Sequence, residues 1–418
     1  MQPLDWIILI LYFVFVLSIG VIFFKRAGGN LENFFLSGRK LPWWLAGLSM
    51  VATTFAADTP LAVAELVGQN GIAGNWLWWN MLIGGMLTVF FFSRLWRRAN
   101  ILTDVEFIEL RYSGKPAAIL RGFKSLYLGI FMNVIIMGWV NLAMSKILIG
   151  MFPEYINDSN VLYYIGACMV LTALYSAMSG LWGVVMTDAV QFTLAMIGCI
   201  ILAIVVISQP EIGGVSGLQE KLPEWAFQFT PNVSAETPVQ DTAGILSCFS
   251  LFAWIIRCVC RLVLYPDLSQ ADKGLGFVHA MRDYLPTGLR GLLLAAFFGA
   301  YMSTISTQLN WGTSYFINDF YKRFISKKSS DDSYVAVSRI MTIVFMLLSV
   351  LVTTQMSTIS GVWSFVIECG AGLGLVLILR WFWWRVNAWA EIAATVAPFV
   401  VYGVLYFGEF DIKFPDSL

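Results

Sequence analysis

The chain has 418 residues, of which 58% are hydrophobic and only 12% are charged, and its formal net charge is +0. A soluble domain carries about 25% charged residues, so this composition excludes an ordinary globular protein. Its balanced charge gives no reason to expect nucleic acid as a partner. Apolar stretches of about 20 residues recur along the whole chain, which predicts a polytopic helical protein embedded in a lipid bilayer.

The predicted membrane spans follow one another along the chain with polar connections between them. The first, about 4–24, has no basic segment before it and no small-residue cleavage site, so we expect a retained helix rather than a signal peptide. The segment "DVEFIELRYSG" has an amphipathic pattern that is typical of a helix at the membrane interface. The remaining spans cover about 42–68, 72–95, 120–150, 160–179, 184–208, 243–265, 288–320, 335–354, 358–380 and 387–408.

Lysine and arginine residues orient these spans, because cytoplasmic loops collect them. The loop after the first span is basic, whereas the segment before that span has no basic residue. The stretches "FFFSRLWRR", "YKRFISKK" and "RWFWWR" are also basic, but the connections 151–160 and 209–241 carry only Lys221. This pattern predicts a plasma (inner) membrane protein with its N-terminus outside.

Residue types that support covalent chemistry are scarce. The six cysteines lie in apolar stretches without a CxxC spacing, which is typical of small buried hydrophobic residues. The single histidine, His279, is predicted to lie in a polar loop, so we expect neither a histidine metal site nor a histidine proton relay. Since no GxSxG, HExxH or P-loop pattern is present either, we expect no catalytic residues and no enzyme.

The stretch "TTFAADTP" interrupts the second predicted span with hydroxyls, a carboxylate and Pro60. A helix broken at membrane depth frees backbone groups, which is tolerated where they line a cavity or bind something. Transporters use such breaks to hold solute and sodium. The alternative is a helix kinked at Pro60 whose threonines bond back to carbonyls. Asp58 favours the functional interpretation, because acids inside a membrane are functional by default.

Two further polar clusters lie inside predicted spans. "SGLWGVVMTDAVQF" places Asp188 about two turns into a span; the alternative to a functional acid is a carboxylate favoured by the helix dipole. "YMSTISTQLN" gathers Ser303, Thr304 and Thr307, and the first and last of these share one helix face. Such hydroxyls can join freed carbonyls around a sodium ion, or they can bond back to the carbonyls of their own helix.

These segments together resemble the sodium:solute symporter family of sodium-coupled sugar, proline and carboxylate carriers. The matching stretches are "FFLSGRKLPWWLAGLSMVATTFAADTP", "SGLWGVVMTDAVQ" and "LPTGLRGLLLAAFFGAYMSTISTQLNWGTSYFINDFYKRF", and the resemblance covers nearly the whole chain. It implies an all-α, LeuT-like five-plus-five inverted-repeat fold with one extra N-terminal and at least one extra C-terminal helix. The chain 1–418 is then one transporter domain, with an extra helix at 1–30, repeats at 40–208 and 243–380, and a C-terminal helix at 387–408.

The resemblance also implies sodium as the coupling ion and assigns its ligands. The ion would be held by the carbonyls of Ala52, Phe55 and Ala300 and by the hydroxyls of Ser303 and Thr304. Asp188 would match an acidic residue of the family that lies close to the sodium exit path.

The solute residues match the family less well. Each candidate lies on the broken helix or faces it; they are Thr54, Asp58, Thr59, Asn75, Asn80, Asn133, Asn141 and Trp254, with Ser145 and Phe252 as neighbours. For each asparagine the alternative is an interhelical hydrogen bond, worth about 0.6 kcal/mol. Asp58 has two open roles, binding a solute amine or pairing with a lysine such as Lys146, and the role of Glu368 is open as well.

The implied function is a sodium-coupled secondary active symporter that imports a sugar, an amino acid or a carboxylate by alternating access. One rival is a transporter-like solute sensor, which requires a cytoplasmic signalling module. The other is an intramembrane enzyme, which requires a nucleophile with its base or a metal. The sequence leaves the oligomeric state open.

The predicted span 243–265 does not fit the inside–outside assignment of the connections around it. The connections on both sides of it are expected outside, which requires an even number of spans between them. Arg257 and Arg261 lie inside its apolar run, each costing about 3 kcal/mol at a helix centre. The family has two helices here, joined by a glycine-rich basic segment that this chain lacks. We therefore expect residues to be missing between about Phe252 and Val263; the alternative is a re-entrant or interfacial segment.

Overall fold

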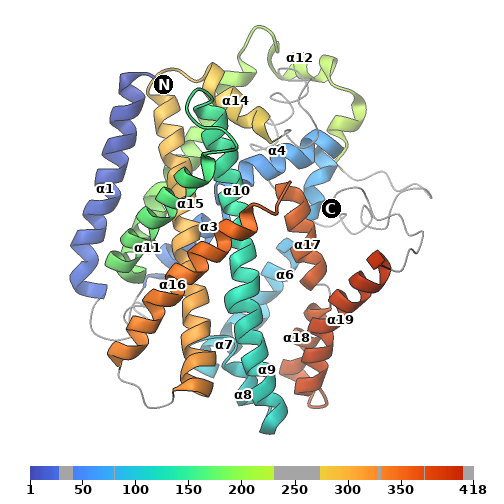
Figure 1. Ribbon diagram of the computed structural model, residues 1–418. Helices are drawn as coiled ribbons and strands as arrows, with labels where there is room; N and C mark the ends of the chain where they lie inside the picture. The colour runs from blue at the N-terminus through green and yellow to red at the C-terminus, as the bar shows by residue number, and fades with distance from the viewer. Residues whose placement is uncertain (28–40, 80, 230–273, 327–330, 371, 408–418) are drawn as a thin grey trace. The chain divides into compact units, whose positions relative to one another are not determined.

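The computed structural model describes residues 1–27, 41–79, 81–229, 274–326, 331–370 and 372–407. Every element that these residues form is helical, as the composition predicted (Figure 1). The first half contains α1 (Pro3–Ala27), α3 (Trp43–Thr54), α4 (Asp58–Asn70), η2 (Ile72–Asn75), α5 (Trp76–Trp79), α6 (Met81–Leu87), η3 (Thr88–Phe92), α7 (Ser93–Ala99), α8 (Phe107–Arg111), α9 (Gly114–Leu126), η4 (Tyr127–Met132), α10 (Asn133–Met151) and α11 (Val161–Ile207). The second contains α12 (Gly214–Lys221), η5 (Glu224–Phe227), α14 (Leu275–Tyr284), α15 (Leu289–Ser314), η9 (Tyr315–Ile325), α16 (Asp331–Thr353), α17 (Ile359–Gly370), α18 (Leu373–Phe382) and α19 (Ala388–Phe407). The predicted span 243–265 lies outside the described residues. The polar loop predicted around His279 is wrong, because this residue lies within α14, whose apolar residues Phe277, Val278 and Met281 are buried.

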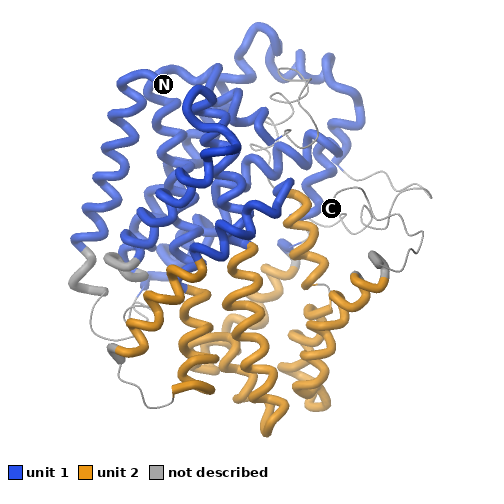
Figure 2. Tube along the Cα trace, in the orientation of Figure 1, with its two compact units in different colours: residues 1–83, 136–310, 346–359 blue, residues 84–135, 311–345, 360–418 orange. Residues whose placement is uncertain are grey.

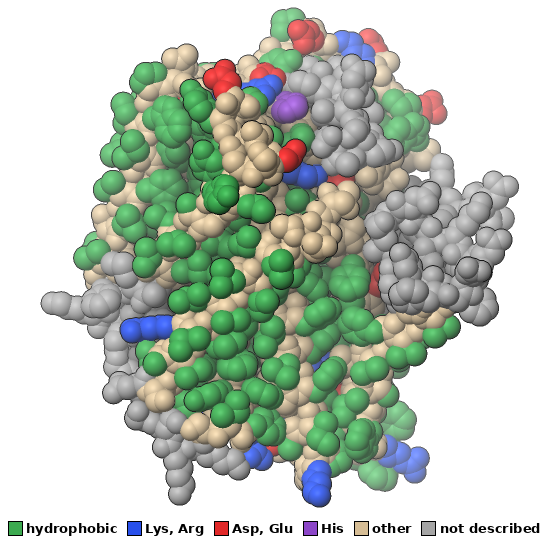
Figure 3. All heavy atoms as spheres, viewed as in Figure 1, with side chains coloured by type: hydrophobic (Ala, Val, Ile, Leu, Met, Phe, Trp, Pro, Cys, Tyr) green, Lys and Arg blue, Asp and Glu red, His purple; other side chains and the backbone are tan. Residues whose placement is uncertain are grey.

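Length and hydropathy allow seven of the described helices to cross a membrane, and an eighth if the bent pair α3 and α4 forms one span. Helix α1 shows why such a helix suits a membrane. It buries Asp5, Leu9, Tyr12 and Val16, which recur at helical spacing along one stripe. Apolar side chains such as Ile10, which is 59% exposed, cover the remaining surface, and hydrophobic side chains also dominate the face seen in Figure 3. In a bilayer such a surface faces lipid.

Helix α11 is a single 47-residue element where two spans, 160–179 and 184–208, were predicted. A straight helix of this length would extend about 70 Å, far more than the ~30 Å hydrocarbon core of a bilayer. The Tyr175 hydroxyl, however, donates to the Gly183 carbonyl at 3.0 Å and also bonds the Thr187 hydroxyl. Tyr175 and Thr187 would lie about 18 Å apart along a straight axis, so α11 bends back on itself and forms two limbs. Asp188 lies on the second limb.

The second predicted span is broken, as its sequence indicated: α3 and α4 meet at an angle of 54°. Pro60 contributes to the break, because a proline has no N–H to donate to the carbonyl of Ala56. The N–H of Thr59 donates to that carbonyl instead, at 3.2 Å, and a new helix begins. Proline is tolerated within the first turn of that new helix, where N–H groups lack helical partners in any case.

The chain forms two compact units (Figure 2). Unit 1 consists of residues 1–83, 136–310 and 346–359, and unit 2 of residues 84–135, 311–345 and 360–418. Unit 1 contains α1, α3, α4, α11 and most of α15. Each unit mixes residues from both predicted repeats, so the division into repeats at 40–208 and 243–380 stays a prediction.

Candidate functional site

The candidate site begins at the end of α3, where the break in the helix frees backbone carbonyls. The last four carbonyls of any helix lack helical donors. At α3, hydroxyl groups satisfy two of the carbonyls that follow Val51. Thr304 Oγ1, on α15, donates to the carbonyl of Thr53 at 3.0 Å, and Thr59 Oγ1 donates to the carbonyl of Thr54 at 3.3 Å. The first of these bonds joins α15 directly to the broken helix.

The carbonyls of Ala52 and Phe55 stay without such partners. The helical donor to Phe55 would be the N–H of Thr59, but that group donates to Ala56. Among the hydrogen bonds of the described residues, none donated from beyond α3 reaches the carbonyl of Ala52 or Phe55. The structure therefore leaves free the same two carbonyls that the family resemblance assigns to sodium.

Helix α15 presents a buried face of hydroxyls to this break. Ser303 is 2% exposed, and its Oγ makes no hydrogen bond of ordinary geometry in the part of the chain that the structure describes, although it interacts with the carboxylate of Asp188. Thr304 Oγ1 lies 3.1 Å from the carbonyl of Ala300 as well as 3.0 Å from that of Thr53 on α3, so its single proton is shared between its own helix and the neighbouring one. Thr307 Oγ1 lies 3.4 Å from Thr53 Oγ1. A buried hydroxyl without an ordinary hydrogen bond is costly, which favours a ligand at Ser303.

Asp188 completes the cluster from α11. Its side chain is fully buried, and Oδ2 accepts a hydrogen bond from the hydroxyl of Ser49 on α3. Its Oδ1 has no partner among the described residues. Asp188 lies well inside its limb of α11 rather than in a first turn, so the helix dipole does not explain its presence. Helices α3, α11 and α15 of unit 1 therefore meet around oxygen atoms.

These oxygens suit a sodium ion. Hard cations take carbonyl, hydroxyl and carboxylate oxygens. Ala52, Ala300, Ser303 and Thr304 are all at most 5% exposed, so a cation bound there would be shielded from bulk water. The described residues contain no group of three or more His, Cys, Asp or Glu side chains that could hold a different kind of metal. The predicted sodium ligands belong to one unit, and their roles stay a prediction.

Three of the predicted solute residues lie at the break itself. Thr54 bonds back to the carbonyl of Val51 at 2.9 Å, as the kinked-helix alternative described. Thr59 is held to Thr54 by the bond given above. Asp58 begins α4 and is 3% exposed. The partial positive charge at a helix N-terminus favours a carboxylate there, which gives one physical reason for an acid at this depth.

Two predicted asparagines use their amides within the protein. Asn75 accepts a hydrogen bond from the indole N–H of Trp78 at 3.1 Å. Asn141, which is fully buried, accepts from the Tyr301 hydroxyl at 2.8 Å and donates to Ser349 at 3.4 Å. Asn141 therefore fits the interhelical alternative, because its contacts join α10 to α15 and α16. Solute binding by these two residues stays a prediction.

The solute roles of the other three candidates stay predictions. Asn133 belongs to unit 2, where it is 2% exposed and packs near the backbone of Gly312. Asn80 and Trp254 lie outside the described residues, as does the segment from Phe252 to Val263.

Sequence reasoning missed two members of the site, Ser49 and Thr53. Ser49 precedes Thr53 by one helical turn and shares its face, and Thr53 Oγ1 donates back to the Ser49 carbonyl at 3.0 Å. That spacing is visible in the sequence. The role of Ser49 is not, because the partner of its side chain, Asp188, lies 139 residues away along the chain.

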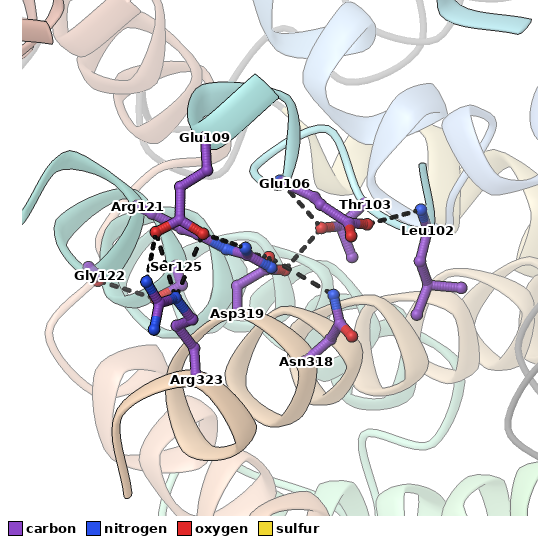
Figure 4. Close-up of polar contacts among 10 residues, drawn as sticks. All are labelled: Leu102, Thr103, Glu106, Glu109, Arg121, Gly122, Ser125, Asn318, Asp319 and Arg323. Carbon is purple, nitrogen blue, oxygen red and sulfur yellow. Dashed lines mark hydrogen bonds and ion pairs between the residues drawn. The ribbon is translucent and has the colours of Figure 1, made fainter. Parts of the chain in front are cut away.

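A separate polar cluster lies in unit 2 (Figure 4). Asp319 is fully buried and accepts from Arg121 Nη2 at 2.7 Å and from Thr103 at 2.6 Å. Arg121 also pairs with Glu109 at 2.6 Å, and Arg323 pairs with Glu109 at 3.1 Å. Burial raises the pKa of Glu109, but the two arginines outweigh it and hold that pKa below its ordinary value. These charges satisfy one another, so the cluster ties α8, α9 and η9 together.

Comparison with known proteins identifies the family of this chain. The profile of the Sodium:solute symporter family matches residues 34–259 and 250–396. The chain is similar to Sodium/glucose cotransporter 1 of Oryctolagus cuniculus, with 23% identity over 95% of this chain and 71% of that protein. It is equally similar, at 23% identity, to the Sodium/glucose cotransporter of Vibrio parahaemolyticus, over 99% of this chain and 87% of that one.

A solved structure shares the fold. The substrate-bound, outward-open state of a Na⁺-coupled sialic acid symporter superimposes with a TM-score of 0.75 at 19% identity, covering 98% of this chain and 92% of that one. The expected LeuT-like architecture is thereby confirmed. The family profile spans most of the chain, and the broken helix lies inside its first match. This multi-pass integral membrane protein belongs to the sodium:solute symporter family.

Proposed function

We propose that this symporter couples sodium entry to the import of one small polar organic solute by alternating access, with sodium bound between α3 and α15. The main support for this site is a set of oxygens that make no ordinary hydrogen bond among the described residues: the carbonyls of Ala52 and Phe55 and the hydroxyl of Ser303. In a continuous helix these carbonyls would have donors. Their availability beside a buried hydroxyl supports a cation site.

In this proposal the Ala300 carbonyl and the Thr304 hydroxyl complete the set of sodium ligands. Thr304 then acts in two ways, because its hydroxyl already joins α15 to α3 through Thr53. Sodium bound to Ala52 and Phe55 would order the residues between α3 and α4. The same segment carries Thr54 and leads into Asp58 and Thr59, the proposed solute residues. Ordering it with sodium therefore prepares the solute site, which couples the two bindings thermodynamically.

We assign Asp188 to the sodium path rather than to the solute. Its carboxylate is held toward α3 by Ser49, and one of its oxygens is unused. A buried acid beside a neutral oxygen site attracts a cation as it passes between the site and the solution. This arrangement predicts an effect on the rate of transport more than on the affinity for solute.

We infer the class of solute from the names of the related proteins. Their names include glucose and myo-inositol cotransporters, and the structural relative is a sialic acid symporter. These solutes are small and rich in hydroxyl groups, so sugars and sugar acids are the first compounds to test, followed by amino acids and carboxylates. We further propose that the protein is not an enzyme, binds no nucleic acid, and lies in the bilayer of the plasma (inner) membrane with its N-terminus outside.

The experiment is solute counterflow in proteoliposomes made with the purified full-length protein. Vesicles loaded with one unlabelled candidate solute are diluted into labelled solute, with sodium or with potassium. A transient accumulation that requires both the protein and sodium is the expected result. Sodium-dependent solute binding without counterflow would instead identify a sensor. Counterflow of equal size in potassium would overturn the proposed coupling to sodium.

A further inference from the structure

Helix α1 precedes the repeats that form the transport fold, yet it is bonded to the start of α15. Asp5 Oδ1 accepts the backbone N–H groups of Gly288 at 2.7 Å and Gly291 at 3.0 Å, and Oδ2 accepts the N–H of Gln2 at 2.9 Å. Asp5 is fully buried. The first N–H groups of a helix have no partner within that helix, and a carboxylate is a favourable acceptor for them. Asp5 therefore caps α15 from a neighbouring helix.

The two helices also touch closely along their length. A Cβ on Gly291 would lie 2.6 Å from the Cα of Asp5, so only glycine fits there. Two turns further along α15, a Cβ on Gly299 would lie 2.9 Å from the hydroxyl of Tyr12. Beside this second point the rings of Phe13 and Phe298 meet edge to face at 5.3 Å. Helix α1 thus follows α15 as far as the residue that precedes Ala300.

The Tyr12 hydroxyl joins this contact to α11. It accepts a hydrogen bond from Gln191 Nε2 at 2.8 Å, and both side chains are buried. Gln191 lies three residues after Asp188, on the same face of the helix. A Cβ on Gly299 would also lie 2.8 Å from Gln191 Cγ. One hydroxyl therefore meets α15 beside a proposed sodium ligand and α11 within one turn of the proposed sodium path.

We propose that Tyr12 is a positioning residue for sodium binding, with Asp5 as the anchor that holds α1 in place. Tyr12 touches no proposed ligand atom. It acts by fixing the distance and rotation between α15 and α11, and so between Ala300 and Asp188. A cation site tolerates little displacement of its oxygens, because each ligand must stay at bonding distance. This inference rests on the proposed sodium site.

The test uses Tyr12→Phe, which removes one oxygen and keeps the ring beside Phe13. Uptake by the purified full-length protein in proteoliposomes is measured against sodium concentration at a fixed solute concentration. The half-saturating sodium concentration is expected to rise about three- to tenfold, while the maximal rate at saturating sodium stays close to wild type. A variant that only lowers the amount of folded protein would reduce the maximal rate and leave half-saturation unchanged.

The matched control is Tyr112→Phe in unit 2, which removes a buried hydroxyl bonded to Glu391 at 2.7 Å. Its half-saturating sodium concentration is expected to equal that of wild type. A second variant pair probes the anchor: Asp5→Asn keeps an acceptor oxygen for Gly288 and Gly291, so it should bind sodium better than Asp5→Ala. Gln191→Leu should reproduce the shift of Tyr12→Phe, and the double variant should add little to either.

The outcomes separate the two claims. If wild-type uptake does not depend on sodium, the proposed function fails and this inference fails with it. If wild type depends on sodium and Tyr12→Phe has the half-saturation of wild type, the inference alone is overturned. A shift of equal size in Tyr112→Phe would also overturn it, because the effect would then follow from the loss of any buried hydroxyl bond.

Discussion

Replacing Ser303 with alanine separates sodium binding from protein stability. Ser303 is 2% exposed, and its hydroxyl makes no hydrogen bond of ordinary geometry in the described part of the chain, although it lies close enough to Asp188 to interact with that carboxylate. A buried hydroxyl without an ordinary hydrogen bond costs about 1–3 kcal/mol. Removing it should leave the free energy of unfolding in sodium-free buffer unchanged or slightly higher. The proposed sodium site, by contrast, loses one of its oxygen ligands.

The loss of one oxygen ligand determines how much the sodium affinity should fall. A tenfold change in affinity corresponds to about 1.4 kcal/mol, which lies within the range of one hydrogen bond or ligand contact to a charged group. We expect Ser303→Ala to raise the half-saturating sodium concentration of uptake about tenfold. Adding Thr304→Ala should raise it further, since this second change removes a ligand and the bond to the Thr53 carbonyl. The double variant should also lose thermal stability, which the single variant should not.

The assay measures uptake in proteoliposomes against sodium concentration, together with thermal unfolding of the purified protein in detergent without sodium. Ser125→Ala is the matched control, because Ser125 is fully buried and donates to the Gly122 carbonyl at 2.8 Å. It should lose about 0.5–1.5 kcal/mol of stability and keep its sodium dependence. An unchanged sodium dependence in Ser303→Ala, at normal expression, would refute the assignment.

Other predictions follow from the same structure. Asp188→Asn should slow uptake more than it weakens equilibrium solute binding, and equal losses in both measurements would count against the proposed sodium path. Calorimetry should show tighter solute binding with sodium than without it; one affinity in both buffers would contradict the coupling. Because the pKa of Glu109 is held below its ordinary value of 4.5, its ion pairs stabilise the fold above that pH and are lost as the pH falls through the lowered pKa. Glu109→Gln should therefore melt earlier than wild type at pH 7, with a gap that closes in acid; a gap independent of pH would argue otherwise. Finally, sequencing of the transcript should reveal additional codons between about Phe252 and Val263, and a transcript identical to the present sequence would refute that expectation.

The alignments to known proteins also concern the segment between Phe252 and Val263. The family profile matches in two parts, 34–259 and 250–396, which meet inside the segment in question. The alignment to the Oryctolagus cuniculus protein runs over 479 positions, more than the 418 residues of the chain, so that relative has segments without a counterpart here. Both observations are consistent with a missing stretch.

Local sequence determined the class of the protein and the places where its helices fail. Hydropathy over about 20 residues suffices to recognise a span, and the polar stretch that contains Pro60 indicates where one is broken, because both act through neighbouring residues. The same holds for the amphipathic segment that became α8. The two limbs of α11 were also predicted from hydropathy, although the structure joins them in one bent helix.

Only the tertiary structure decided which backbone carbonyls remain without a hydrogen-bond donor. The composition of the Thr53–Pro60 stretch shows that carbonyls are freed, but not that hydroxyls of Thr304 and Thr59 take two of them and leave those of Ala52 and Phe55. Likewise, Ser49 meets Asp188 and Tyr12 meets Gln191 across more than a hundred residues of sequence. Such contacts depend on the depth and rotation of each helix against its neighbours, and hydrogen bonds form only within a few tenths of an ångström and tens of degrees. Periodicity within one helix carries no information about that register.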